Sequence, residues 1–349
     1  MELYIFNKSD RQMSGIIEAY EYLRWTRRYS RCGAFELKAV ATAENLALLR
    51  IANILWKNDD EEAGLIEFVE LTLKEQEFIL VSGRLATGFL ARRIVLETVR
   101  ISNDLGLGIG QLIYQNITNP TDASRKIAGI EHLPFSLGIN IQTQISYRNL
   151  MAVVTDLCDA ADVGIKTVFN PSNGIFTIKT YWGNNTSAVF SREFENIIEQ
   201  VFTQSIVDYA TFALVGGEGE GAERTFVTVG GGDGEDRQEI FVDARDLQSE
   251  SFPGTYEDAL AFRGLSKLAE LAMVEAFDAT VNQYGNLTYK VDFDIGSNIQ
   301  AVSKHWGVSL NARITEIEES YDREGMSLSA TFGKPLMTID EKIRTMGGV

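Results

Sequence analysis

The final long stretch of the sequence, residues 307–333, alternates between apolar and polar residues on both sides of a polar turn. The apolar positions are Val308, Leu310, Ala312 and Ile314 before the turn and Met326, Leu328, Ala330 and Phe332 after it. A period of two gives each strand one buried face and one solvated face, and Gly325 supplies permissive backbone for the return. The stretch predicts a β-hairpin, and we expect it to be half of a barrel whose partner lies at the opposite end of the chain.

The first block, residues 1–98, is rich in predicted strands. They cover residues 2–7, 15–25, 33–40, 54–57, 63–71 and 77–82. Thr42 precedes a helical stretch over residues 42–53, where its hydroxyl can cap the first turn. This order of elements predicts a small β-barrel domain.

The second block, residues 99–205, predicts an α+β domain. Helices are expected to begin at Pro120, Ser146 and Ser191, and the turn at 170–174 is typical of a hairpin. The helix after Ser191 is predicted from the spacing of Phe194, Ile197, Ile198, Val201 and Phe202. Cys158 lies on the apolar stripe of the helix after Ser146, which favours a buried, unreactive thiol.

The third block, residues 206–349, returns to strands around an intervening helix at about 255–271, with a short helix or tail at 337–345. We expect it to form a second β-barrel. The fold class predicted for the chain is therefore α+β and rich in β-structure, with two small barrels joined by an α+β insertion.

One short segment between two predicted strands departs from the acidic character of the chain. Residues 24–31 read RWTRRYSR, with four arginines, two aromatic residues and no acid. Arginine, tryptophan and tyrosine are enriched at the energetic centres of protein interfaces. We therefore predict a subunit interface here, with a solvated loop as the alternative. The interface candidates are Arg24, Trp25, Arg27, Arg28 and Tyr29.

Composition narrows the class of protein. The 349 residues carry a net charge of −17, which disfavours binding to nucleic-acid phosphates. No stretch of about 18 apolar residues predicts a membrane span, and the N-terminus lacks the pattern of a signal peptide. Two cysteines, Cys32 and Cys158, form no disulfide framework, so we expect folding in a reducing cytoplasm.

No catalytic, cofactor or metal site is predicted. His132 and His305 lie outside any spaced ligand pattern, and the acidic turn at 58–62 lacks the spacing of a calcium loop. The glycine-rich segments at 216–221 and 230–236 join strand to strand and carry acids, so we interpret them as hairpin tips rather than phosphate loops. Asp292 and Asp294 alternate with apolar residues, which predicts a solvated outer face rather than a catalytic pair.

Several stretches in order give the sequence a recognisable likeness. ELYIFN, YEYLRWTRRYSRCGAFEL and ILWKNDDEEAGLIE near the start resemble the siphovirus-type phage tail hub, or tail-tip, family. RQEIFVDARDLQSES, YEDALAFRGLSKLAEL, FDIGSNIQAV and WGVSLNARITEIEESYDREGMSLSATFGKP resemble its second half. The likeness runs over about residues 1–340 and is carried by fold-level stretches rather than by catalytic motifs.

The resemblance implies a relative of the baseplate hubs of contractile phages and of type VI secretion spikes. Such hubs are homotrimers whose paired barrels give six similar modules, which match a hexameric tail tube above and meet a spike or fibre below. An acidic lumen would let DNA pass without binding. This implies a virion tail protein assembled in the host cytoplasm.

Two other functions stay open at the level of the sequence. Many family members carry a C-terminal hydrolase or receptor-binding module, but this sequence stops at Val349, so lytic activity is not expected. A receptor- or carbohydrate-binding module would need aromatic platforms on one exposed face, for which Trp182 and Trp306 are the obvious candidates.

Overall fold

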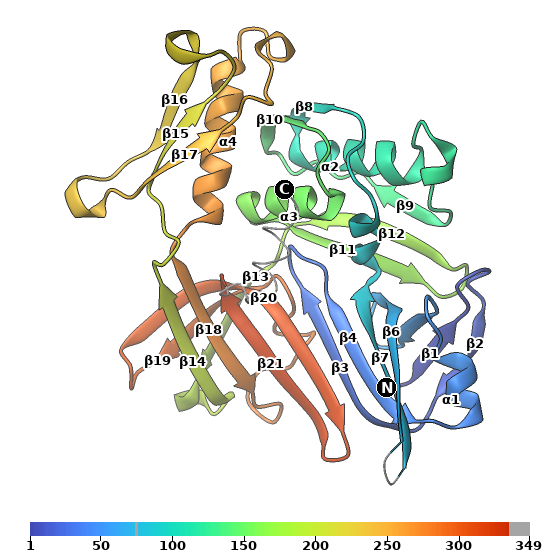
Figure 1. Ribbon diagram of the computed structural model, residues 1–349. Helices are drawn as coiled ribbons and strands as arrows, with labels where there is room; N and C mark the ends of the chain where they lie inside the picture. The colour runs from blue at the N-terminus through green and yellow to red at the C-terminus, as the bar shows by residue number, and fades with distance from the viewer. Residues whose placement is uncertain (74–75, 335–349) are drawn as a thin grey trace.

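The computed structural model describes residues 1–73 and 76–334. Strands from the two ends of the chain lie side by side in one large sheet, and two smaller α+β layers lie above it (Figure 1). The large sheet has 13 strands, and its main path runs β14-β18-β21-β20-β3-β4-β7-β6-β5-β1-β2. The chain is thus α+β and β-rich, as predicted. The expectation for 337–345 lies outside the described residues.

The N-terminal part of the large sheet contains four long strands, which we call the first unit. They are β3 (Tyr20–Arg28), β4 (Ala34–Val40), β6 (Ala63–Leu73) and β7 (Glu77–Leu85). Beside them lie β1 (Leu3–Phe6), β2 (Met13–Ile17), β5 (Ile54–Lys57) and the short helix α1 (Ala43–Leu48). The hydroxyl of Thr42 accepts a hydrogen bond from the Asn45 backbone at 3.1 Å, which confirms the predicted cap.

The C-terminal part contains four equivalent long strands, the second unit. They are β14 (Ile197–Ser205), β18 (Val274–Val281), β20 (Val308–Asp322) and β21 (Gly325–Gly333). Two further strands, β13 (Asn185–Ser191) and β19 (Asn298–Ser303), pair with each other, and β19 also pairs with β20. The predicted closing hairpin is confirmed as β20 and β21, with Leu328, Ala330 and Phe332 buried.

The two units share one strand order. In each, the third and fourth strands of the chain form a hairpin, and the fourth lies beside the second, giving β3-β4-β7-β6 and β14-β18-β21-β20. Their irregularities also coincide. The register shift between Tyr20 and Tyr22 of β3 recurs between Ile197 and Glu199 of β14.

The second irregularity fixes the correspondence for the hairpin strands. The shift between Ile66 and Phe68 of β6 recurs between Ile314 and Glu316 of β20. Bulges are specific local features of a strand pair, so this double coincidence makes the units residue-for-residue equivalents. Cross-strand aromatic pairs support this: Trp25 and Phe35 have ring centroids 5.9 Å apart, and their counterparts Phe202 and Phe277 are 6.4 Å apart.

Closed barrels were expected, and the described strands form none. The first and second units instead join edge to edge, where β20 pairs with β3 from Glu316↔Arg28 to Tyr321↔Leu23. Each unit covers its own apolar core, one centred on Leu37 and Val81 and the other on Phe277 and Phe332. Pairing between the units replaces the closure of each one on itself.

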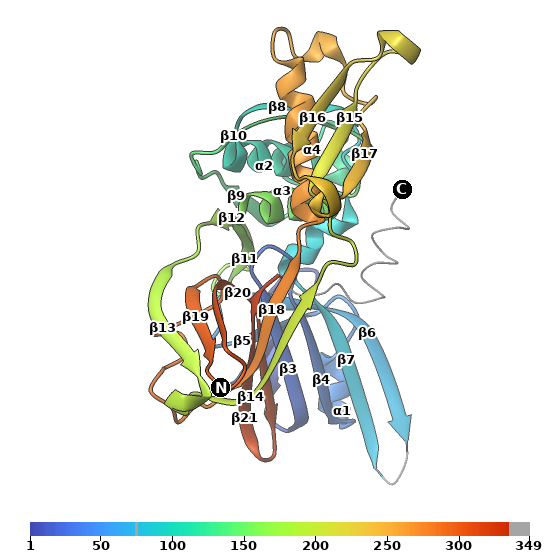
Figure 2. The same ribbon diagram turned by 90° about the vertical axis from the view of Figure 1, so that its left-hand side faces the viewer.

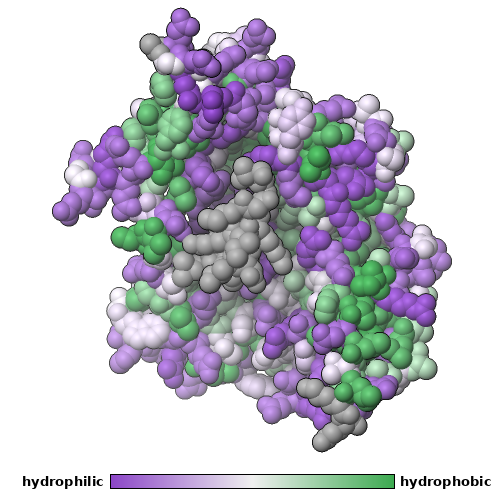
Figure 3. All heavy atoms as spheres, viewed as in Figure 1, coloured by the Kyte–Doolittle hydropathy of each residue, from purple (hydrophilic) through white to green (hydrophobic). Residues whose placement is uncertain are grey.

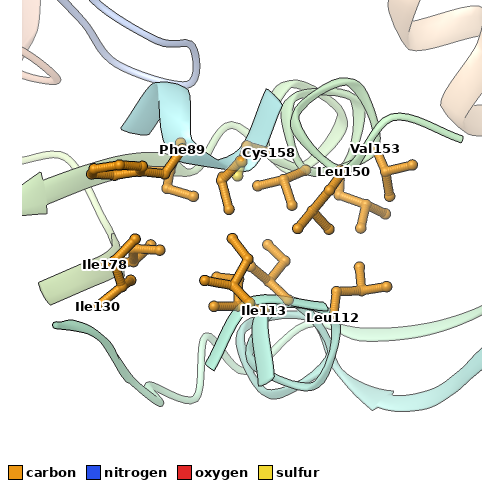
Figure 4. Packing of buried hydrophobic residues seen from close by; sticks show 14 of the residues in the cluster. Phe89, Leu112, Ile113, Ile130, Leu150, Val153, Cys158 and Ile178 are labelled. Carbon is orange, nitrogen blue, oxygen red and sulfur yellow. The ribbon is translucent and has the colours of Figure 1, made fainter. Parts of the chain in front are cut away.

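The first α+β layer is built from residues 99–181. Its elements are β8 (Val99–Asp104), α2 (Leu105–Ile113), β9 (Ile130–Leu133), β10 (Asn140–Ile145), α3 (Leu150–Ala161), β11 (Gly164–Asn170) and β12 (Ile175–Tyr181). Figure 4 shows Leu112 and Ile113 of α2 pointing toward Leu150 and Val153 of α3. The β11–β12 hairpin is confirmed, whereas Asn149 rather than Ser146 caps α3, and residues 123–125 form only a single 3₁₀ turn after Pro120.

The second layer is built from the strands that follow the second unit's first strand. It comprises β15 (Phe212–Gly216), β16 (Phe226–Gly230), β17 (Glu239–Asp243) and α4 (Tyr256–Glu270). The helix expected at about 255–271 is therefore confirmed. α4 packs on this small sheet through Ala259 and Leu260 and also meets α3 (Figure 2). The glycine-rich segment at 216–221 lies in the turn of the β15–β16 hairpin, as predicted. The segment at 230–236 is no hairpin tip, because it joins β16 to β17 and these strands lie on opposite sides of β15.

The helix predicted after Ser191 is wrong, because residues 197–205 form the strand β14. Its apolar residues lie on both faces: Ile197 is buried, while Ile198 and Val201 are 55% and 57% exposed. Apolar residues on both faces of a strand can imitate the stripe of a helix. Strands β13 and β14, within residues 185–205, pair with the C-terminal strands β19 and β18.

Candidate functional site

The arginine-rich segment singled out in the sequence lies inside the sheet rather than in a connecting loop. Residues 24–28 end β3, which is paired with β4 on one side and with β20 on the other. Trp25 and Tyr29 are fully or almost fully buried, and Arg27 is 4% exposed. Arg24 keeps 59% of its side chain exposed. Most of the segment therefore forms the junction between the first and second units.

Arg27 links three parts of the chain at this junction. Its guanidinium pairs with Asp294 and Tyr289 of the second half, and its Nε lies 3.4 Å from Asp60. Asp60 in turn accepts a hydrogen bond from the Trp25 indole at 3.1 Å. Burial opposes the charge of Arg27, but Asp60, Tyr289 and Asp294 outweigh it and raise its pKa. A buried cation of this kind requires its anions to stay in place.

A second buried ion pair lies beside the first. Lys57 Nζ donates to Glu319 Oε2 at 2.6 Å, and both side chains are at most 1% exposed. Tyr289 and Tyr321 donate to the same carboxylate at 2.7 and 2.6 Å. Burial disfavours the carboxylate, but Lys57 and Lys290 overcome this and lower the pKa of Glu319 to about 2. Glu319 is thus ionised and held by both halves.

Tyr29 connects the junction to the α+β insertion. Its hydroxyl donates to the Asp162 carbonyl at 3.1 Å and accepts from the Gly183 backbone at 2.8 Å. Arg313 of β20 lies over the Tyr29 ring at 4.8 Å and pairs with the Asp162 carboxylate at 2.5 Å. The insertion and both units are therefore tied through one aromatic side chain.

Charge and hydrogen bonding at this junction fix the geometry between the units. Arg28 adds an ion pair with Glu316 at 2.6 Å, and Thr26 donates to Glu318 at 3.2 Å. Arg27, Arg28, Lys57 and Thr26 are each engaged by an acid from the other half. Such an arrangement specifies one docking geometry, which a purely apolar contact would leave less defined. We infer that this network of side chains has a structural role and holds the two units together in a fixed orientation.

Two acidic groups were interpreted differently from the sequence. Acids in the turn at 58–62 would ordinarily be solvated, and Asp59 and Glu61 are exposed, but Asp60 and Glu62 are buried and Asp60 faces Arg27 and Lys57. Asp294 was expected on an outer face but pairs with Arg27. Over residues 1–73 and 76–334, no group of three His, Cys, Asp or Glu side chains is arranged to hold a metal ion.

The remaining candidates lie apart from the junction. Burial lowers the pKa of His132 on β9 to about 4, so its imidazole is neutral at pH 7. Both cysteines are free thiols, Cys158 is buried, and burial raises its pKa. Trp182 and Trp306 are 44% and 45% exposed, and within the described chain neither ring packs on another. Among residues 1–73 and 76–334, the helices are too short or too polar to span a membrane.

The two outer edges of the paired units form a second candidate surface, which the sequence did not single out. Beyond its first residues, β6 has β7 on one side and no strand on the other within the described chain, and β14 pairs only with β18. Phe68, Leu71 and Leu73 of β6 are 46%, 62% and 73% exposed. Apolar atoms flank the grey tip of this hairpin at the lower edge of Figure 3. Exposed apolar edges of this kind mark interaction sites.

The chain matches one family of known proteins over nearly its whole length. The family model described as Siphovirus ReqiPepy6 Gp37-like protein matches residues 2–334. A search of curated proteins found no significant match.

Several solved structures share the fold at low sequence identity. The 43 kDa tail protein of prophage MuSo2 from Shewanella oneidensis has a TM-score of 0.61 and 14% identity, with 96% of this chain and 99% of that chain covered. Prophage tail protein gp18 from Listeria monocytogenes has a TM-score of 0.58 and 11% identity, with both chains fully covered. A chain of the Francisella PdpA–VgrG complex has a TM-score of 0.54 and 8% identity, covering 95% of this chain but 52% of that one.

Proposed function

The chain belongs to the Siphovirus ReqiPepy6 Gp37-like family, and we propose that it is the structural hub of a phage or phage-like tail tip. Three copies form a ring between the hexameric tail tube and the distal spike or fibre. The fold shared with prophage tail proteins of Shewanella and Listeria supports a place in the virion tail. The proposed role is structural and not enzymatic.

The duplicated four-strand unit is the observation that carries this proposal. Two equivalent units lie side by side in one chain with the same strand order and the same bulges. A ring of three such chains presents six similar units. Three-fold chain symmetry can thereby match a six-fold tube on one side and a three-fold spike on the other.

The DNA conduit is the second part of the proposal. The strand face opposite the two cores carries charged side chains, among them Glu70, Glu199 and Glu318. Some acids on this face are neutralised within the chain, as Arg24–Glu36 and Arg28–Glu316 show. We propose that this face lines a lumen that DNA crosses without specific binding, because unneutralised carboxylates repel phosphate.

The arginine-rich segment retains a smaller part in subunit contacts. Trp25, Arg27 and Tyr29 are occupied by partners in the same chain. Arg24 has an exposed side chain, so a contact of this segment with a neighbouring subunit or with the tube protein is proposed for Arg24 and the adjoining Arg28. Charge reversal at Arg24 tests it: trimers that assemble into complete tails despite Arg24→Glu would remove it.

Electron microscopy of the particle tests the hub assignment. An affinity-tagged full chain, labelled in intact particles, should place the label at the distal end of the tail tube and in no other part of the virion. Label along the whole tube, on fibres alone, or on the head would contradict the proposal. Release of cell-wall fragments by the purified chain would support the hydrolase alternative instead.

A further inference from the structure

The junction inside the chain is a template for a contact between chains. β20 is the outermost strand of the second unit and β3 the outermost strand of the first, and they pair with each other. By the duplication, β6 is the counterpart of β20, and β14 is the counterpart of β3. β6 and β14 lie at opposite ends of the paired units, so they cannot meet within one chain. Both edges therefore lack the neighbour that their counterparts have.

We propose that β6 of one chain pairs antiparallel with β14 of the next, in the register that the internal junction prescribes. This inference rests on the proposed trimeric hub and adds the contact that closes it. Transferring the β20–β3 pairing through the equivalences places Phe68 opposite Ser205, Glu70 opposite Thr203, and Leu71 opposite Phe202 of the neighbour. Thr72 then faces Val201.

A hydrogen-bonded pair in the internal junction reappears as the same residue types at the outer edges. Thr26 donates to Glu318 Oε2 at 3.2 Å across β3 and β20. The equivalent positions hold Thr203 on β14 and Glu70 on β6. Glu318 also accepts at Oε1 from Ser320 two residues on, at 3.3 Å, and Glu70 accepts at Oε1 from Thr72 at 3.2 Å. Glu70 is therefore arranged as Glu318 is, with its second oxygen aimed at no partner in the described chain.

The apolar positions fit the same register. Leu71 is 62% exposed. Its counterpart at the internal junction, Glu319, is only 1% exposed because β20 is paired there with the first unit. Phe202 is the counterpart of Trp25, which is completely buried beside β20. Pairing of the outer edges would bury Leu71 against Phe202 and satisfy the free backbone groups of both strands. A second copy of this chain therefore supplies the missing neighbour of each edge.

Paired cysteines test the register in the full-length chain. Adjacent antiparallel pairs alternate between a closer and a wider spacing, so we use both L71C/F202C and T72C/V201C. Since β6 and β14 lie at opposite ends of the paired units within one chain, any disulfide between them joins two chains. Mild oxidation should give covalent trimers with at least one pair, about tenfold more than the off-register control L71C/S205C. The corresponding single-cysteine variants measure the background from Cys32.

The outcomes separate this inference from the hub proposal. Native mass spectrometry of the unmodified chain reports whether a trimer exists. A trimer in which neither in-register pair crosslinks above the control would overturn the β6–β14 contact and leave the hub standing. A chain that stays monomeric would overturn both.

A charge exchange gives an independent test without cysteine. Thr203→Glu places a second carboxylate opposite Glu70 of the neighbour, and like charges directly opposite destabilise strand pairs. We expect the dissociation constant of the trimer to rise about 5-fold. Adding Glu70→Lys to Thr203→Glu should restore the trimer. Thermal unfolding of the dilute variants controls for folding. A double variant whose trimer is as weak as that of Thr203→Glu alone would contradict the predicted pairing.

Discussion

The internal junction and the outer edges occupy equivalent positions in the duplicated fold but differ in chemistry. At the junction, the positions that face the core hold Arg27 and Glu319, both buried and paired with opposite charges. Their equivalents at the outer edges are Gln204 and Leu71. At these core-facing positions, one strand pairing is thus built with ions inside the chain, while the other presents an apolar and a neutral polar side chain.

The difference follows from when each contact forms. The partners of Arg27 are in the same chain and arrive with folding, so its charge is never left uncompensated in the native protein. An edge that waits for a second chain would leave a buried charge to be desolvated on association, which costs several kcal/mol for each ion. Leu71 and Phe202 avoid that cost and gain from burial instead.

Removal of the Arg27 charge should produce the largest effect on the junction. Arg27→Met leaves Asp294 without its cation and Asp60 with Lys57 alone, and such a loss costs about 4 kcal/mol of the free energy of unfolding. Arg24→Met on the same strand is the matched control, because its exposed ion pair with Glu36 contributes less than about 1 kcal/mol. Urea unfolding of both variants measures the difference. Equal losses would show that the junction is no more dependent on charge than the surface.

The next largest effect is expected in the pH dependence of stability, through the buried carboxyl group of Glu62 near Asp60 and Arg27 of the junction. Burial, with Asp60 adding to it, raises the pKa of Glu62 to about 8. Because this is above the value in the unfolded chain, the stabilising contribution is complete below about pH 4.5 and is lost as the pH rises through 8. Glu62→Gln should therefore be similar to the wild type near pH 5 and about 4 kcal/mol more stable at pH 9. Stability curves that stay parallel from pH 5 to 9 would contradict a buried, protonated Glu62.

A smaller effect is expected when the first unit is made to resemble the second. Trp25→Phe introduces the aromatic type found at Phe202 and removes the indole donor to Asp60. Loss of one buried hydrogen bond to a charged group costs about 1.5–3 kcal/mol. Phe202→Trp is the reciprocal variant and should leave the stability of the single chain within about 0.5 kcal/mol, since Phe202 lies at an open edge. A larger loss for Phe202→Trp than for Trp25→Phe would invert the comparison.

Seven of the eight long strands of the two units could be predicted, because their periodicity is local. The β20–β21 hairpin carries its signal in consecutive residues, and so does the cap at Thr42. β14 was missed because it is an edge strand whose exposed Ile198 and Val201 break the alternation. The exposed apolar side chains that made the strand look like a helix in the sequence also indicate that β14 lacks a neighbouring strand.

The junction could be located only in part. The unusual arginines marked β3, but the ions that neutralise them come from distant positions; Lys57 and Glu319 are separated by 262 residues. Glu319 does share the buried face of its strand with Ile317, so an acid in an apolar row was a visible signal. Its partner could not be identified, because no local pattern relates the first block to the last. The duplication itself is hidden in the sequence, since it is preserved in bulges and pairing rather than in residue identity.

The mass of the native assembly tests the central claim most directly. Native mass spectrometry of the purified full-length chain should give a closed trimer, in which six equivalent four-strand units complete one ring. A single species at three times the mass of the chain is the predicted result. A monomer at all concentrations, or an assembly whose number of chains is not a multiple of three, would contradict the account.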